Sequence, residues 1–368
     1  MTLPKGHLTS LLACMPEGIG DLTFGTDSFL EVAQSVLSNT VSRRGSQLPE
    51  LPAFTMCFVG HNPPAYLHLG GSIAWNFTIN GAEGRVAAGE LPESECDYRI
   101  EGDHSLMSNY ARVLHQGVNP AIRQHATNRL ERIGRWEIGG KLPDSSILIS
   151  LLHEFHDQLA SRVMPRFTFM TPEWVSSARH VLTSRANSEK YRDLLTSVSF
   201  TFSEEFTNTP RYAFPDGSHG GFWVNVVNGA VTVGAGPLPE ELGPADMLTK
   251  GNYIPVVPVG RTVNVALTDQ DKSAQRDYSR AAFAARADGV LPVNQSSPSG
   301  GSPMSPELGK IFVPLHDELS KRTSSELPSD FDDGIEERWR TPQSFDRDPS
   351  FDKTWLRYEQ YDIYGDEL

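Results

Sequence analysis

Apolar and polar residues alternate along several short stretches of the chain. Trp75, Phe77 and Ile79 are separated by single polar residues, which is the period-two pattern of a strand with one buried face. The same pattern predicts strands at Phe54 to Val59, Ile73 to Ile79, Arg85 to Ala88, Asp97 to Ile100 and Arg135 to Ile138. Asn80-Gly81, between the second and third of these strands, favours a tight hairpin.

Apolar residues at helical spacing predict helices before and after these strands. Phe29, Val32 and Val36 share one helical face, and Thr26 or Asp27 just before them can cap the helix. Further helices are expected from Asp103 to about Leu114, from Pro120 to Ile133 and from about Ser145 to Val163. The predicted fold class is therefore α+β, an antiparallel sheet covered by helices.

The chain repeats this pattern once. Thr23-Phe24-Gly25-Thr26 recurs as Thr168-Phe169-Met170-Thr171, an offset of 145 residues. Later matches keep the order, with Asn80-Gly81 on Asn228-Gly229 and His156 to Arg162 on His316 to Arg322. The second copy predicts strands at Val198 to Phe202, Phe222 to Val227 and Ala230 to Gly234. We expect two copies of one fold, packed about a pseudo-two-fold axis.

The repeat also predicts the domain organisation. An N-terminal lead comprises residues 1–23, and the two units comprise residues 24–165 and 168–328. Residues 329–368 form a separate segment, in which 12 acidic residues stand against 5 basic ones and aromatic residues are interspersed. Because a purely solvated acidic tail would lack those aromatics, we expect an arm that lays its rings over the domains or over the neighbouring subunit of a homodimer.

The first copy resembles the sterol carrier protein type-two family over roughly Phe54 to Leu152. The resemblance rests on the Asn80-Gly81 hairpin, the strand-turn-helix from Cys96 to Asp103, Asn119-Pro120, and the strand from Gly134 to Gly140. It implies a small α+β domain with a hydrophobic tunnel between sheet and helices that holds a lipid or another apolar ligand.

The resemblance implies which side chains contact that ligand, although all of them could equally be plain core. They are Met56, Phe58, Trp75, Phe77, Met107, Tyr110 and Phe155. The second copy departs from the family pattern after Asn252, where a Pro- and Val-rich stretch with Pro255 and Pro258 precedes a charged one. We therefore expect a sizeable apolar cavity in the first copy only.

The motif His-Asp-x-Leu-x-x-Arg is the polar constellation that both copies keep. In the first copy it contains the candidate catalytic residues His156, Asp157 and Arg162, and Arg162 falls on the apolar stripe of its predicted helix. Arg162 could bind a carboxylate or phosphate head. Alternatively, Arg162 and Arg322 cap carbonyls or pair with carboxylates, mostly buried and at the junction between the copies.

The sequence gives little support to a metal or cofactor. His153 and His156 are three residues apart on a predicted helix, but the order is not that of zinc peptidases and no third ligand is evident. There is no Gly-x-Ser-x-Gly elbow, phosphate loop or Gly-x-Gly-x-x-Gly motif. We expect no bound metal and no cofactor.

Composition and charge narrow the location and partners. The chain has 368 residues, 38% of them hydrophobic, and a formal net charge of −14, which disfavours nucleic acid as a partner. Three dispersed cysteines form no disulfide framework, and no apolar run reaches the ~18 residues that span a bilayer. We expect a cytoplasmic protein without stable membrane insertion.

Two functional hypotheses follow. The first is a binding protein for an apolar small molecule, lipid-like or aromatic, held in the first unit. The second is an enzyme that acts on a hydrophobic small molecule in the same pocket, with His156 as general acid or base and Arg162 as the anion clamp. A third is a protein that only scaffolds others through its acidic arm.

Overall fold

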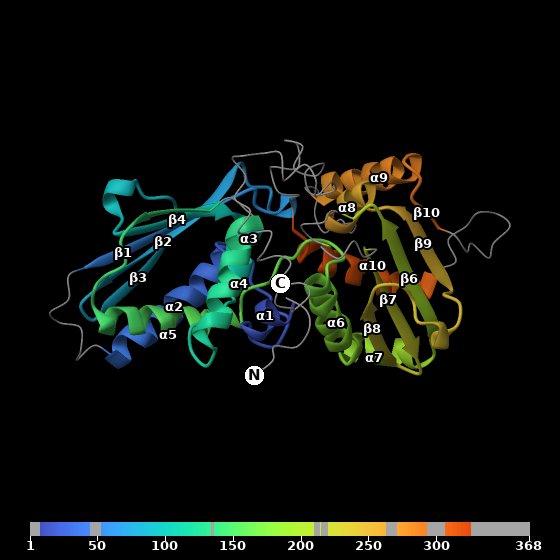
Figure 1. Ribbon diagram of the computed structural model, residues 1–368, viewed down its shortest axis with the longest axis horizontal. Coiled ribbons are helices and arrows are strands. Elements are labelled where there is room, and N and C mark those ends of the chain that lie inside the picture. Colours follow the sequence, from blue (N-terminus) through green and yellow to red (C-terminus); the bar gives the residue numbers. More distant parts are fainter. Residues whose placement is uncertain are drawn as a thin grey trace, which may run out of the picture. The chain divides into compact units, whose positions relative to one another are not determined.

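The computed structural model describes residues 8–44, 53–133, 136–209, 214, 220–262, 271–292 and 306–324. The chain divides into two compact units, an N-terminal unit of His7–Arg166 and a C-terminal unit that begins at Phe167 (Figure 1). Each is an α+β unit with one mixed five-stranded sheet. The predicted acidic arm lies outside the described residues.

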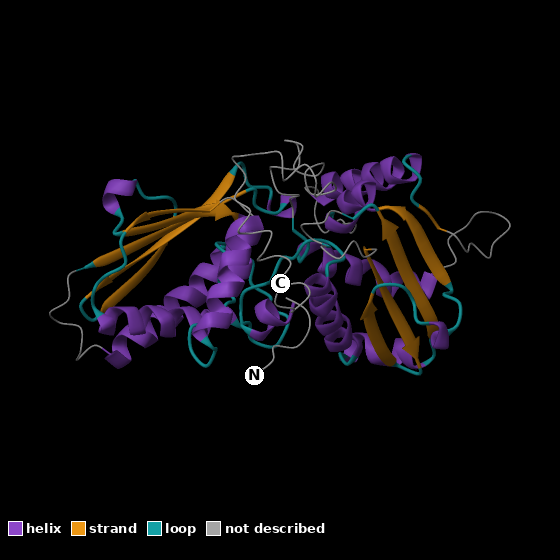
Figure 2. Ribbon diagram, viewed as in Figure 1, coloured by secondary structure: helices purple, strands orange, loops and turns teal. Residues whose placement is uncertain are grey.

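The N-terminal unit places one layer of helices against its sheet (Figure 2). Its elements are α1 (Leu8–Ala13), α2 (Asp27–Arg44), β1 (Phe54–His61), η2 (Ala65–Leu67), β2 (Ser72–Asn80), β3 (Glu83–Ala88), η3 (Glu93–Glu95), β4 (Tyr98–Asp103), α3 (His104–Tyr110), α4 (Pro120–Ile133), β5 (Trp136–Gly140) and α5 (Ser146–Ala160). The strand order is β3-β2-β1-β4-β5.

The expectation of an antiparallel sheet is wrong at one pair of strands. β1 and β4 run parallel, with Met56 opposite Tyr98 and His61 opposite Asp103, whereas the other pairs of this sheet are antiparallel. After β3, at one edge, the chain crosses to the far side of β1 before it forms β4. Such a crossover reverses the direction that a hairpin would have given, and side-chain alternation along a single strand does not report it.

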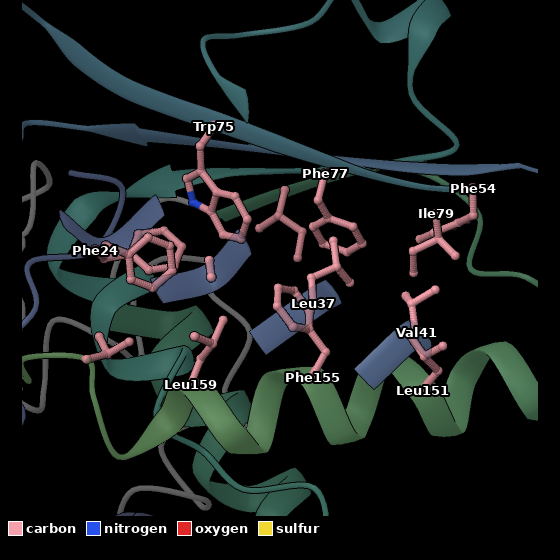
Figure 3. Close-up of a cluster of buried hydrophobic side chains, with 14 of the residues drawn as sticks. Phe24, Leu37, Val41, Phe54, Trp75, Phe77, Ile79, Leu151, Phe155 and Leu159 are labelled. Atoms are coloured by element: carbon pink, nitrogen blue, oxygen red, sulfur yellow. The ribbon is translucent and has the colours of Figure 1, made fainter. Parts of the chain in front are cut away.

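The core of the N-terminal unit lies between the sheet and helices α2 and α5. Trp75, Phe77 and Ile79 project from β2 towards Leu37 and Val41 of α2 and towards Leu151, Phe155 and Leu159 of α5 (Figure 3). All of these side chains are nearly inaccessible to solvent. The alternation seen in the sequence is thus the inward face of β2, whose burial gives the strand its place in the sheet.

The C-terminal unit repeats the topology. Its elements are α6 (Pro172–Ala186), α7 (Glu189–Thr196), β6 (Ser199–Thr207), β7 (Gly220–Val227), β8 (Ala230–Ala235), η4 (Glu240–Leu242), β9 (Met247–Asn252), α8 (Tyr253–Arg261), α9 (Asp271–Ala287), β10 (Leu291–Pro292) and α10 (Pro306–Lys321). The strand order β10-β9-β6-β7-β8 corresponds one for one to that of the first sheet, and β6 and β9 form the parallel pair.

The correspondence extends to individual hydrogen bonds. The Thr55 N–H donates to Asp97 Oδ2 at 2.7 Å, and the Asp97 N–H donates to the Thr55 carbonyl at 2.9 Å. Thr201 and Asp246 form the same two bonds at 2.7 and 2.8 Å. These bonds fix the alignment of the copies at offsets of 146 residues in β1 and β6 and 149 residues before β4 and β9. The two units therefore have the same fold.

The Pro-rich stretch after Asn252 keeps the fold despite its different sequence. It forms α8, which follows β9 as α3 follows β4, and the charged stretch beyond it forms α9. Asn252 caps α8, and Pro255 lies in the first turn, where its missing N–H would have had no intrahelical acceptor. None of the described helices is both long and apolar enough to cross a membrane.

The described part of the N-terminal lead, from Leu8 on, belongs to the N-terminal unit, and Arg112 ties it to the end of α5. Arg112 is 2% exposed, and its guanidinium group donates to the carbonyls of Ala160 and Val163. It also donates to Pro16 and Gly18 of the lead, at 2.9 and 3.1 Å. One buried cation therefore satisfies four carbonyls from two segments.

Arg162 does not have the buried position that we expected. Helix α5 ends at Ala160, so the helical phase used to place Arg162 no longer applies, and its side chain is exposed. The expectation of burial is confirmed for Arg322, which is 1% exposed. Arg322 donates to the carbonyl and the carboxylate of Glu318, one turn earlier in α10, both at 3.0 Å.

Arg112→Met is expected to destabilise the N-terminal unit by at least about 2 kcal/mol, because the carbonyls lose a buried donor. Arg162→Met, an exposed control, should change the free energy of unfolding by less than about 0.5 kcal/mol. Urea unfolding followed by amide hydrogen exchange of β1 and β2 measures both. Equal effects of the two substitutions would contradict this assignment.

Candidate functional site

The N-terminal unit encloses an apolar cavity of about 150 Å³ between its sheet and its helices. All seven side chains that the resemblance implied lie on its wall: Met56, Phe58, Trp75, Phe77, Met107, Tyr110 and Phe155. Figure 3 shows several wall residues, with Trp75 and Phe77 on the sheet side and Phe155 and Leu159 on α5. A cavity of this size and composition accommodates a benzene-sized molecule.

Aromatic rings build the sheet side of the cavity. The Phe58 and Trp75 rings, paired across β1 and β2, stack with centroids 4.4 Å apart and planes 13° apart. The ring centroids of Phe24 and Trp75 are 5.6 Å apart, and those of Phe77 and Phe155 are 5.2 Å apart, both pairs in an edge-to-face arrangement. Rings held at these angles pack as rigid plates, which leave space between them that flexible aliphatic chains would fill.

Trp75 also brings a polar group to this wall. Its indole N–H is buried and has no acceptor among the residues that the structure describes. Burial of a donor without an acceptor costs free energy, so an acceptor placed within reach of this N–H would stabilise the folded protein.

Three histidines form a polar part of the wall, and they come from two segments. His153 and His156 lie on α5, and His115 lies between α3 and α4. The His115 ring stacks on His153 with centroids 4.1 Å apart and meets the edge of His156 at 4.6 Å. His156 Nε2 donates to the Val113 carbonyl at 3.0 Å, which leaves Nδ1 as the acceptor of that ring.

The three imidazoles are neutral at physiological pH. Burial, followed by the neighbouring His156, His153 and Arg123, lowers the pKa of His115 to about 2. Burial also lowers the pKa of His153, and Arg123 adds to that effect. Burial likewise lowers the pKa of His156. The cluster therefore offers uncharged hydrogen-bonding groups rather than a positive site.

The candidate catalytic residues do not converge on the cavity. His156 lines it, but Asp157 accepts hydrogen bonds from the backbone N–H groups of His115 and Gln116, both at 2.8 Å. Asp157 thus holds the segment that carries His115. Arg162 is exposed, and it lies outside the described wall of the cavity.

Sequence reasoning missed His115. It is 38 residues before His153, in a segment without periodicity, so no spacing connects it with α5. The backbone bonds from its segment to Asp157 bring it there.

The C-terminal unit also encloses an apolar cavity, so the expectation of a cavity in the first copy only is wrong. Its volume is about 210 Å³. Phe169 and Trp174 take the places of Phe24 and Phe29, and His316 takes that of His156. The cavity arises from the separation of sheet and helices, which the altered sequence of α8 and α9 preserves.

Comparisons with known proteins add no identification. Neither the protein-family models nor the curated proteins contain a match to this chain. Within the described ranges, no three His, Cys, Asp or Glu side chains are grouped so that they could hold a metal ion.

The ring C–H resonances of His115 should stay constant in NMR spectra from pH 8 down to about pH 4.5, since its pKa is about 2. The unfolded chain takes up a proton near pH 6.5, so the stability that neutral His115 gives is lost progressively as the pH falls below that value. A titration midpoint of His115 above pH 5.5 would contradict a neutral cluster.

Proposed function

We propose that this protein binds an apolar small molecule, aromatic or lipid-like, in the cavity of the N-terminal unit. The observation that carries the proposal is an apolar space bounded by rigid aromatic rings, with a few polar groups on its wall. Small-molecule sites in proteins have this composition, mostly apolar with a small number of placed polar groups.

The polar groups suggest how a ligand would be oriented. The indole N–H of Trp75 can donate to an oxygen or nitrogen of the ligand, and the neutral imidazoles can accept or donate. A molecule with an apolar body and one uncharged polar group fits these features best. The resemblance to the sterol carrier protein type-two family supports the same class of ligand, since that family holds apolar molecules between sheet and helices.

An exposed apolar rim supports entry of the ligand near β5 and the start of α5. Leu142 lines the cavity and is 42% exposed, and Ile138 and Ile147 are exposed on either side of it in the sequence. Exposed apolar side chains beside a cavity reduce the cost of passing an apolar molecule from water to the interior.

The second candidate, an enzyme in the same cavity, rests on His156. This imidazole is neutral and its Nδ1 is an acceptor, as a general base requires. Its lowered pKa makes it a weak base, and Arg162 is too exposed to clamp an anionic group inside the cavity. Ligand turnover that is lost in His156→Phe, while binding is kept, would favour the enzyme.

Ala111→Trp is expected to abolish binding in the N-terminal unit, because the larger side chain occupies the cavity that Ala111 lines. Toluene serves as the probe, and the NMR signal of the Trp75 indole N–H reports binding. In the wild type this signal should shift with toluene concentration, whereas in Ala111→Trp it should not respond.

Ala82→Trp, which adds the same side chain at an exposed position in the turn between β2 and β3, should bind toluene like the wild type. A Trp75 signal that responds equally in Ala111→Trp, or that does not respond in the wild type, would overturn the proposed site.

A further inference from the structure

Glu204 is the feature that distinguishes the second cavity from the first. It lies on β6 opposite Phe222 and Thr249, as Phe58 lies on β1 opposite Trp75 and Ile100. Both side chains line the cavity of their own unit. At the same position of the same fold, the first copy has a phenyl ring and the second has a carboxyl group.

The carboxyl group of Glu204 has an apolar setting. Phe202 and Phe222 flank it, with their ring centroids 5.6 Å apart. The ring centroids of Trp174 and Phe222 are 5.2 Å apart in an edge-to-face arrangement. Within the part of the chain that the structure describes, no cation or hydrogen-bond donor is paired with Glu204. The residue is half-buried, and removal of its carboxyl group from water is the cause that raises its pKa to about 8.

The other titratable groups on the described wall of this cavity are Tyr278 and His316. Tyr278 of α9 lines the cavity, and burial, Glu204 and Asp317 raise the pKa of its phenol, whereas Arg286 lowers it by a smaller amount. The ring centroids of His316 in α10 and Tyr278 are 5.2 Å apart in an edge-to-face arrangement, and His316 Nδ1 lies 3.3 Å from Ser320 Oγ. The partners of Glu204 across the sheet, Phe222 and Thr249, do not titrate.

A ligand can supply the missing positive charge. A carboxylate surrounded by aromatic faces recognises an ammonium ion, through a charge-assisted hydrogen bond and through cation–π attraction. We propose that the cavity of the C-terminal unit binds a small apolar molecule that carries a protonated amine, with the ammonium group paired to Glu204 and the apolar part among Phe202, Phe222 and Trp174.

This site is independent of the one proposed for the N-terminal unit, which has Phe58 in place of the acid and takes uncharged ligands. On binding, the Glu204 carboxyl loses its proton to solvent, and the ammonium ion forms an ion pair with the resulting carboxylate. Because the pKa of Glu204 is about 8, only about one tenth of its carboxyl groups are ionised at pH 7. This lowers the affinity for the ammonium ion about tenfold relative to a carboxyl group that is already ionised. The negative charge of the chain attracts cationic ligands in addition.

The test is calorimetric titration of the full-length protein carrying Ala111→Trp, which fills the N-terminal cavity, with 2-phenylethylammonium at pH 7 and with 2-phenylethanol as the uncharged probe of similar size. This reference protein should bind the amine at least tenfold more tightly than the alcohol. Titrations in buffers of different ionisation enthalpy should show release of close to one proton per amine bound, since the carboxyl is mostly protonated beforehand.

Glu204→Gln should weaken amine binding at least tenfold and abolish proton release, while alcohol binding is retained. Glu205→Gln is the matched control: it removes the same charge at the adjacent position of β6, where Glu205 pairs with Lys250 at 2.8 Å. Alternation along the strand directs Glu205 away from the cavity. The affinity of the Glu205→Gln variant for the amine should therefore stay within twofold of that of the unsubstituted protein.

Three results would overturn the proposal: unchanged amine affinity in Glu204→Gln, equal affinity for the amine and the alcohol in the protein whose N-terminal cavity is filled by Ala111→Trp, or no amine binding at millimolar concentration. Circular dichroism checks that the variants fold. If Glu204→Gln does not fold, the proton release of the wild type decides, because neither cavity has another carboxyl on its described wall.

Discussion

The structure depends on how an aromatic sheet face packs against two amphipathic helices. In the N-terminal unit, the inward side chains of β1 and β2 and the apolar stripe of α5 must leave water together, and their burial stabilises both layers. Trp75, Phe58 and Phe77 are large and rigid, so they fix the spacing of the layers without filling all the space between them. The cavity is a consequence of the core, not a feature added to it.

The second copy also has a cavity between sheet and helices, although its sequence has diverged. β9 and α8 follow one another as β4 and α3 do, although the residues of α8 include two prolines within the helix. The copies differ instead in the chemistry of the wall. Phe58 becomes Glu204 and His153 becomes Val313, while His156 is kept as His316. One architecture thus offers two cavities of different polarity in a single chain.

Much of the fold could be predicted from the sequence, because burial of one strand face leaves a period of two. Trp75, Phe77 and Ile79 gave β2, and Asn80-Gly81 gave its turn into β3. The direction of β4 could not be predicted, because alternation does not reveal which strand a segment pairs with. The seven wall residues named from the resemblance do line the cavity, but the same residues would be apolar in a filled core.

The polar residues were less predictable, since their positions depend on where helices end and on backbone contacts far away in sequence. Arg162 was misplaced because α5 stops at Ala160, before the assumed helical phase reaches it. Arg112 is a buried arginine of this unit, and no hydrophobic periodicity around it indicates that it is buried. His115 joins the cavity only because Asp157 holds its backbone.

The central claim is that both units keep the same incompletely filled space between sheet and helices. Diffraction from crystals held under xenon pressure tests it most directly, because xenon enters apolar cavities of this size without a specific contact. The account predicts xenon beside Trp75 in the N-terminal unit and beside Phe222 in the C-terminal unit. Side chains that fill both positions and exclude xenon would contradict it.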